Sequence, residues 1–212
     1  MSLFSIAPTE SISAGDVPAL RISTKYMENF LPLRAVSSGT EIHTMLNSSG
    51  ALDIYSVGTD AKVYRYRRSK DRMAPYDETD LGIRASQLYL FDPAGGDPDR
   101  PAIFGLDSKG KITLATWHDG GYGQRNTGPD ADVVRNFRGV RGITGRIYIN
   151  VVVDDGRLGV NYYDPQTDKW GGSTWAPVKG PDGRDAKVKE ITTAANNPVQ
   201  SALFAIGMDD EV

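Results

Sequence analysis

The stretch PAIFGLDSKGKITLAT, Pro101–Thr116, decides how this chain is built. An apolar run is followed by a polar turn of Asp, Ser, Lys and Gly, and a second strand-like run then begins at Ile112. Two such runs around a turn predict a β-hairpin. The same order of residues returns in three other places, namely Ala51–Tyr66 (ALDIYSVGTDAKVYRY), Arg146–Tyr163 (RIYINVVVDDGRLGVNYY) and Ser201–Val212 (SALFAIGMDDEV).

The residue that follows each turn gives the spacing of the repeat. Val63, Ile112, Leu158 and Val212 lie 49, 46 and 54 positions apart. A strand-built repeat of about 40–50 residues is typical of β-propellers and related arrays. The sequence therefore predicts an all-β fold, a β-propeller-like array of about four repeats. Because the second strand of the fourth repeat only begins at Val212, we expect an incomplete or truncated propeller, or one that the N-terminal residues complete.

The predicted organisation has two parts. Residues 1–30 are expected to form an extended N-terminal leader, rich in Ser, Pro and small residues. Residues 31–212 are expected to form the repeat domain, with repeats at about 31–82, 83–132, 133–185 and, as a partial repeat, 186–212.

Each repeat is predicted to have a leading strand before its hairpin and a polar connector after it. The predicted leading strands are Leu33–Ser37, Ser86–Phe91, Gly139–Thr144 and Val188–Ala194. The predicted connectors, rich in the turn residues Gly, Pro, Asp and Asn, are Ser69–Gly82, Asp92–Arg100, Asp119–Asp132 and Asp164–Asp185. The nearly continuous β-branched run Ile147–Val153 predicts a strand that is packed on both faces.

Composition excludes several classes of function. A formal net charge of −3 argues against nucleic-acid partners and anionic membranes, which need a basic face. The absence of cysteine excludes disulfides, thiolate zinc sites and cysteine nucleophiles. Met1–Asp16 lacks the basic and apolar regions of a signal peptide, and no run approaches the ~18 apolar residues of a membrane helix. We expect a soluble chain without membrane insertion, either cytoplasmic or exported by another route.

No catalytic residue, metal site or cofactor is predicted. The only two histidines, His43 and His118, lie far apart, and no zinc-binding spacing or GxSxG motif is present. The adjacent carboxylates Asp154-Asp155 and Asp209-Asp210-Glu211 would suit glycoside hydrolysis. Both groups nevertheless fall in the repeated turn, where Asp serves the backbone. We therefore interpret them as turn residues.

Aromatic residues near the strand ends are the candidate ligand-binding residues. Sugar rings present apolar C–H faces and polar rims, so a flat aromatic side chain beside Arg, Asn or Glu can bind them. The alternative is that these aromatics pack between the sheets and need no ligand. The predicted ligand-binding residues are Tyr66, Trp117, His118, Tyr122, Arg125, Tyr163, Trp170 and Trp175.

The phrases IFGLDSKGKITLATWHDGGYG and INVVVDDGRLGVNYYDPQTDKWGG resemble repeats of bacterial and fungal β-propeller lectins. Fucose-binding and tectonin-like propellers are the nearest types, and the resemblance covers about residues 33–212. It implies glycan sites between adjacent blades, made by a Trp or Tyr with an Arg and a Glu. Trp117, at the end of its strand, matches the aromatic residue of the family pattern. In the first and third repeats Tyr66 and Tyr163 occupy this position. A regular Arg–Glu partner does not recur.

The predicted function is that of a non-catalytic binding module for carbohydrate, with a glycan or glycoconjugate as partner. The first alternative is a protein-interaction scaffold that belongs to a larger protein, with a protein partner or additional repeats. The second is a sialidase-like glycoside hydrolase propeller.

Overall fold

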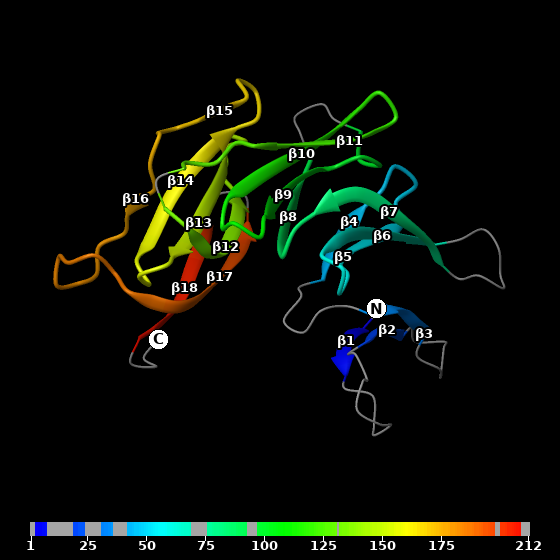
Figure 1. The fold of residues 1–212 in the computed structure, drawn as a ribbon, viewed down its shortest axis with the longest axis horizontal. Coiled ribbons are helices and arrows are strands. Elements are labelled where there is room, and N and C mark those ends of the chain that lie inside the picture. Colours follow the sequence, from blue (N-terminus) through cyan, green and yellow to red (C-terminus); the bar gives the residue numbers. More distant parts are fainter. Residues whose placement is uncertain are drawn as a thin grey trace. The chain divides into compact units, whose positions relative to one another are not determined.

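Strands are the regular structure of this chain (Figure 1). The structure is a computed structural model, and it describes residues 3–7, 19–23, 31–35, 42–68, 76–92, 97–130, 132–197 and 200–208. These residues contain no helix, and the strand pairs that they form are antiparallel. The prediction of an all-β fold is confirmed. The chain divides into two compact units, Met1–Ser86 and Gln87–Val212.

The first unit contains two antiparallel sheets. One has the strand order β1-β2-β3, made by Leu3–Ala7, Ala19–Ser23 and Leu31–Ala35. The other has the order β4-β5-β6-β7, made by His43–Leu46, Leu52–Val57, Lys62–Arg68 and Tyr76–Arg84. Strands β1 and β2 lie within the residues predicted as an N-terminal leader.

The second unit contains three antiparallel sheets. The β8–β11 sheet consists of Gln87–Phe91, Ala102–Leu106, Ile112–His118 and Gly121–Asn126. The β12–β16 sheet consists of Val134–Arg141, Ile147–Val153, Leu158–Asp164, Lys169–Trp170 and Ala176–Pro177, with both β15 and β16 paired to β14. The β17–β18 sheet consists of Val188–Asn197 and Gln200–Gly207.

One turn geometry recurs at six loops of the described residues. In the β9–β10 hairpin the Asp107 amide donates to the Lys111 carbonyl at 3.0 Å, and the Gly110 amide donates back to the Asp107 carbonyl at 3.2 Å. This is a three-residue loop with a left-handed last residue, since Gly110 has φ +74°. The same pair of backbone bonds occurs in the loops that start at Asn47, Gly58, Gly142, Val153 and Gly180.

The repeated turn produces the same register in three hairpins. Val57 pairs with Val63, Leu106 with Ile112 and Val152 with Leu158. The residues aligned from sequence are therefore structurally equivalent in the first three repeats. Val212, the fourth aligned residue, lies outside the described residues.

The predicted leading strands are right in two repeats and wrong in the other two. Strands β8 and β17 coincide with the predictions for the second and fourth repeats. In the third repeat the strand is Val134–Arg141, and the predicted end at Ile143 and Thr144 lies in the β12–β13 turn. In the first repeat β4, His43–Leu46, precedes the hairpin, whereas Leu31–Ala35 belongs to the other sheet.

Three of the predicted connectors contain the last strands of their sheets. Strands β11, β15 and β16, and β7 as far as Gly82, lie in the residues predicted as loops. Asp119 and Gly120, with φ of 46° and 90°, form a two-residue turn between β10 and β11, as an Asp-Gly pair favours. Because these strands stand at sheet edges, few of their side chains enter the core, and the apolar pattern that identifies an inner strand is missing.

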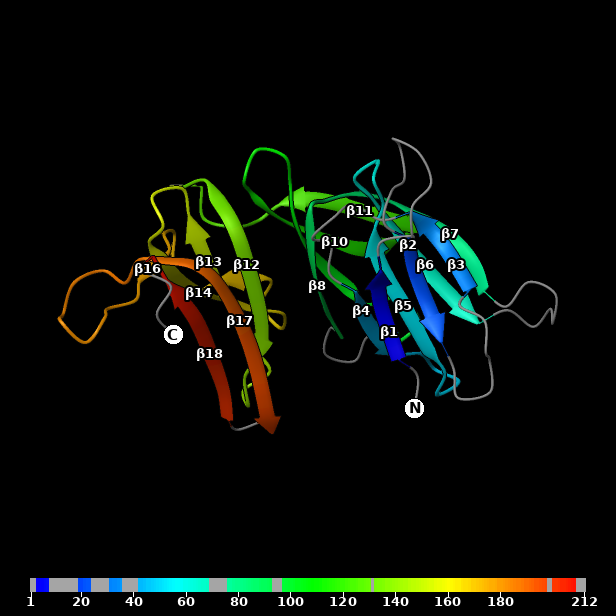
Figure 2. The ribbon, with the colours of Figure 1, turned by 90° about the horizontal axis from the view of Figure 1, so that it is seen from below.

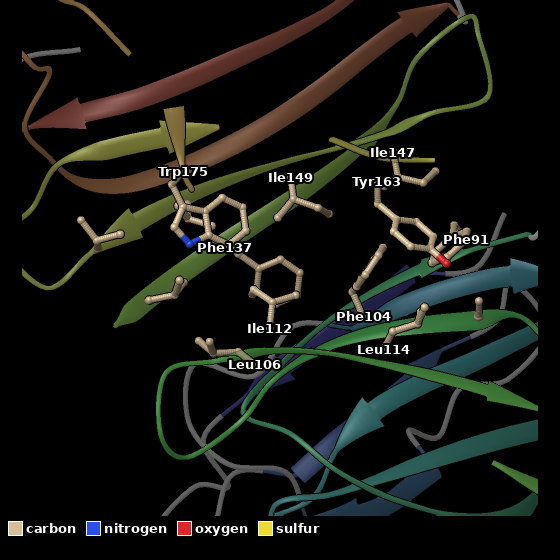
Figure 3. Close-up of a cluster of buried hydrophobic side chains, with 14 residues drawn as sticks. Phe91, Phe104, Leu106, Ile112, Leu114, Phe137, Ile147, Ile149, Tyr163 and Trp175 are labelled. Atoms are coloured by element: carbon tan, nitrogen blue, oxygen red, sulfur yellow. The ribbon is translucent and has the colours of Figure 1, made fainter. Parts of the chain in front are cut away.

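The largest hydrophobic core lies between the β8–β11 and β12–β16 sheets (Figure 3). Phe104 and Ile112 from one sheet meet Phe137, Ile149 and other residues of the second, and these four side chains are at most 1% exposed. Burial of one such side chain contributes about 1.5–3 kcal/mol. This contact holds the two sheets of the second unit together.

Strand β13 is packed on both faces, as its β-branched run predicted. Ile147, Ile149 and Val151 face the β8–β11 sheet. Val152 points to the other side and packs with Leu158 against residues of the β17–β18 sheet. Strand β17 lies beside β12, where the Thr193 hydroxyl donates to the Gly139 carbonyl at 3.3 Å (Figure 2).

The repeated turn gives a matched test of stability. A Cβ at Gly110 would lie 2.4 Å from Val133 Cγ1 and 2.9 Å from the Val134 carbonyl oxygen, whereas one at Gly145 would meet nothing within 4 Å. Both glycines have positive φ, so either change to Ala costs about 1 kcal/mol of backbone strain. We expect Gly110→Ala to lower the free energy of unfolding in urea clearly more than Gly145→Ala. Equal losses would contradict the close packing at Gly110.

Candidate functional site

The candidate aromatic residue of the first unit lies in the core. Tyr66 on β6 is 1% exposed and packs with Ile54 and Tyr64. Ile42 and Tyr76 cover this cluster from the sides. The ring of Tyr66 therefore contributes packing and presents no face to solvent.

Tyr163 and Trp175 of the second unit also belong to its core (Figure 3), and the partly buried Trp170 packs against that core. The Tyr163 and Trp170 ring centroids lie 5.3 and 5.7 Å from that of Phe104. Trp175 meets Trp170 edge-on at 5.6 Å and is 5% exposed. Aromatic pairs of this kind stabilise a fold beyond the area that they bury. This arrangement matches the alternative in which aromatics pack between sheets.

Arg125 joins the edge of the β8–β11 sheet to the turn between β14 and β15. Its guanidinium pairs with Asp168, and the Tyr163 hydroxyl donates to the same carboxylate oxygen. Burial alone would raise the pKa of Asp168, but the hydrogen bonds from Tyr163 and Arg125 outweigh it and lower the pKa below the usual value. Burial, followed by the bond to Asp168, raises the pKa of Tyr163. Through its pair with Asp168, Arg125 therefore links the β8–β11 sheet to the β12–β16 sheet.

Trp117, Tyr122 and His118 form a separate cluster at the β10–β11 hairpin. The rings of Trp117 and Tyr122 meet edge-on at 5.3 Å, and the Arg100 guanidinium lies 4.7 Å above the Trp117 ring. The Tyr122 hydroxyl donates to the Pro101 carbonyl at 2.9 Å. His118 is exposed, and its Nε2 lies 2.8 Å from the Thr116 hydroxyl. One face of the indole is thus already covered by a cation.

An open pocket lies on the opposite face of the β12–β16 sheet from the aromatic core. We call it the Tyr148 pocket. Its volume is about 310 Å³, within the range of ~300–1,000 Å³ typical of small-ligand sites. Its lining is Tyr148, Val160, Asn161, Tyr162, Gly171, Gly172, Thr174 and Ala176.

Two tyrosines form the aromatic part of the Tyr148 pocket. Tyr148 and Tyr162 pair across β13 and β14, with ring centroids 6.0 Å apart and planes tilted by 53°. The Arg146 guanidinium lies 4.5 Å above the Tyr162 ring and 3.5 Å from the Asp164 carboxylate. Gly171 lies so close that a Cβ there would be 2.1 Å from Tyr162 Cε1. Tyr162 is thus held in place, while Tyr148 is 37% exposed.

Asn161 builds the wall of the Tyr148 pocket. Its side-chain amide donates to the carbonyls of Gly172 at 2.9 Å and Thr174 at 2.8 Å, and its oxygen accepts the Tyr162 amide. The Asn161 side chain is 8% exposed. These bonds fix the loop between β15 and β16, so the pocket is formed without a ligand.

This pocket was not predicted from the sequence, although the turn pattern of the third repeat contained a signal for it. The turn after Val153 fixes the β13–β14 register, and that register places Tyr148 opposite Tyr162. Tyr163, the neighbour that sequence reasoning chose, points to the core because adjacent residues of a strand face opposite sides.

Of the adjacent carboxylates interpreted as turn residues, Asp155 bonds to the backbone, whereas Asp154 accepts from the Arg135 side chain at 2.7 Å. Asp107 Oδ1 accepts the amides of Lys109 and Lys111 at 2.8 and 2.9 Å, and Asp155 Oδ1 accepts the Arg157 amide at 3.0 Å. The second acidic group, Asp209–Glu211, lies outside the described residues. Within the described ranges, no group of three His, Asp or Glu side chains is placed to hold a metal ion.

Asn47 of the sequon Asn47-Ser48-Ser49 serves the same turn geometry. It is 8% exposed, its amide donates to Asp53 at 2.9 Å, and its oxygen accepts the amides of Ser49 and Ala51. A glycan attached at this nitrogen would displace the bond to Asp53, so the folded hairpin is a poor acceptor.

The chain matches none of the protein-family models and none of the curated proteins with which it was compared. The resemblance to propeller lectins thus stays a prediction. No helix capable of crossing a membrane occurs in the ranges that the structure describes.

Burial of the candidate tryptophans predicts their roles in stability. We expect Trp175→Ala to lower the free energy of unfolding by about 3–5 kcal/mol, because the change opens a cavity among packed rings. Trp117→Ala at the partly exposed hairpin should cost clearly less. Chemical unfolding followed by circular dichroism measures both, and a larger loss for Trp117→Ala would argue against the core assignment.

The Asp168 contact predicts a pH-dependent loss of stability. Asp168→Asn should cost no more than about 1 kcal/mol at neutral pH, since Arg125 and Asp168 are about half exposed and water screens them. Because the folded pKa of Asp168 is lowered, its contribution is present above the usual Asp pKa of about 3.9 and is lost as the pH falls below it. Unfolding curves of the two proteins should therefore converge in acid. Asp130→Asn, at a carboxylate that is 81% exposed, is the control with little effect at any pH.

Proposed function

We propose that this protein is a non-catalytic carbohydrate-binding module of the β-propeller kind, and that its sugar site is the Tyr148 pocket. The observation that carries the proposal is an open, preformed pocket whose exposed Tyr148 ring stands beside an Arg-stacked Tyr162.

The order of the sheets supports a propeller-like arrangement. Propeller blades are four-stranded sheets in which successive strands pair, stacked face to face around an axis. The β4–β7 and β8–β11 sheets have four strands paired in chain order. In the second unit, the β12–β16 sheet packs one face on the β8–β11 sheet and the other on the β17–β18 sheet.

The chemistry of the Tyr148 pocket fits a sugar ring. The apolar C–H face of a sugar can lie on the exposed Tyr148 ring, and Val160 and Ala176 extend this apolar floor. Thr174, the glycine backbone and the two phenols supply polar partners for hydroxyl groups at the rim. No described residue bonds to the phenol oxygen of Tyr148 or Tyr162, so both are open to a ligand.

The proposed module binds without cleaving. Glycoside hydrolysis requires two carboxyl groups on either side of the scissile bond. The lining of the Tyr148 pocket contains no carboxylate and no histidine. Asp164, at the end of β14, is paired with Arg146 and is not part of the lining. The pocket therefore favours recognition over the glycosidase alternative.

A glycan array on the folded chain tests the proposal. We expect glycan hits whose affinity falls by about 10-fold or more in Tyr148→Ala, because about 1.4 kcal/mol of stacking is lost. Tyr148→Phe keeps the ring and should retain most of the binding. An array without hits, or hits that Tyr148→Ala leaves unchanged, would refute the proposed site.

Two glycines of the Tyr148 pocket give a matched control. A Cβ at Gly171 would collide with the Tyr162 ring at 2.1 Å, whereas the nearest atom to a Cβ at Gly172 is Asn161 Nδ2 at 3.8 Å. Gly171→Ala should weaken glycan binding and Gly172→Ala should not. Binding that depends on Trp117 instead would place the site at the β10–β11 hairpin.

A further inference from the structure

Arg146 lies beside the Tyr148 pocket, and its guanidinium makes no hydrogen bond to the described residues. Its Cζ atom is 4.5 Å from the centre of the Tyr162 ring, and this ring lines the pocket. Its ion pair with Asp164 is loose, since Nε lies 3.5 Å from the nearer carboxylate oxygen. The Arg146 side chain is 41% exposed, so a ligand in the pocket can reach its N–H groups.

Other arginines of the second unit use their N–H groups within the chain. Arg125, Arg135 and Arg157 each donate a hydrogen bond to a carboxylate. A guanidinium is planar, and its fork of N–H donors fits a carboxylate through two parallel hydrogen bonds. Stacking on Tyr162 holds the guanidinium of Arg146 in place without using these donors. The donors of Arg146 therefore remain for a group outside the chain.

The charges at this end of the Tyr148 pocket favour an anion. Lys169 on β15 pairs with Asp164 in the sheet, and its neighbour Trp170 packs against the core. Because adjacent residues of a strand face opposite sides, Lys169 and Asp164 lie on the face opposite the core, as Tyr162 does. The cations Arg146 and Lys169 outnumber the one carboxylate on this part of the face. The lining of the pocket has no carboxylate that would repel an anion.

We propose that the ligand of the Tyr148 pocket is an acidic sugar, whose carboxylate binds the Arg146 guanidinium while its ring lies on Tyr148. This inference rests on the proposed carbohydrate-binding function and adds the class of sugar. Uronic acids and sialic acids both carry a carboxylate on a ring with apolar C–H groups. A neutral sugar would leave the charge of Arg146 without a matching group on the ligand.

Asp164 limits the affinity for an acidic sugar. Its carboxylate competes with that of the ligand for Arg146, and like charges repel. Asp164 Oδ1 also accepts the Gln166 amide at 3.0 Å, and the side-chain oxygen of Asn can replace it there. Asp164→Asn should therefore strengthen the binding of an acidic sugar several-fold and leave that of a neutral sugar unchanged. A general loss of structure at this turn would weaken both.

Calorimetric titration with matched sugars tests the inference. The pairs are the methyl glycosides of glucose and glucuronic acid, those of galactose and galacturonic acid, and lactose with sialyllactose. We expect the acidic member of at least one pair to bind about 10-fold or more tightly than its neutral partner, and the pair concerned identifies the source of the carboxylate. Salt at about 1 M should reduce this preference, because it screens charges beyond about 3 Å. Arg146→Gln should abolish the preference, and Arg146→Lys, which keeps the charge without the fork, should retain part of it.

The control is Arg135→Gln, at an arginine that is 64% exposed and pairs with Asp154 beyond the other end of β13. This variant should bind every sugar as the wild type does, and circular dichroism should show all variants folded. Equal affinities within each pair, or a preference that survives Arg146→Gln, would overturn the inference. Tyr148-dependent binding of the neutral sugars would then still support the proposed function. The absence of binding by every sugar would refute the proposed function, and this inference with it.

Discussion

The register of the three-residue hairpin turn is the constraint on which the rest of this structure depends. Its two backbone hydrogen bonds and its left-handed last residue fix the register in which the inner strands pair. A shift of one residue would turn every side chain of a strand to the opposite face. In the β13–β14 hairpin the turn thus decides that Tyr163 enters the core and that Tyr162 reaches the open pocket.

The both-faced burial of β13 follows from that register and limits where function can lie. Apolar residues at successive positions must be covered on two sides, so the centre of the sheet has no room for a ligand. Polar side chains therefore lie toward the ends of the strands and on the outer face of β14. On the outer face, the β17–β18 sheet covers β14 only in part. Leu158 is buried under that sheet, whereas Val160 and Tyr162 are only partly buried. The Tyr148 pocket begins where this cover ends.

The features that could be predicted from the sequence are those encoded by the pattern of apolar residues and by the residue types of the turns. The hairpins around Val63, Ile112 and Leu158, the acidic turn role of Asp155 and the double-sided packing of β13 were all predictable from such patterns. The edge strands β7 and β11 were not, because polar edge strands read as loops. The Tyr148 pocket was missed because its wall depends on bonds from Asn161 to residues 172 and 174, and no local pattern reveals them.

The Tyr148 pocket lies on the part of the outer face of the β12–β16 sheet that the β17–β18 sheet does not cover. The sheet that covers the outer face of β12 and β13 has two described strands, whereas the β8–β11 sheet on the inner face has four. A sheet of two described strands leaves uncovered the part of the neighbouring sheet that it does not reach. This part is lined by phenols and backbone polar groups, which water can solvate, and it can therefore remain open for a ligand.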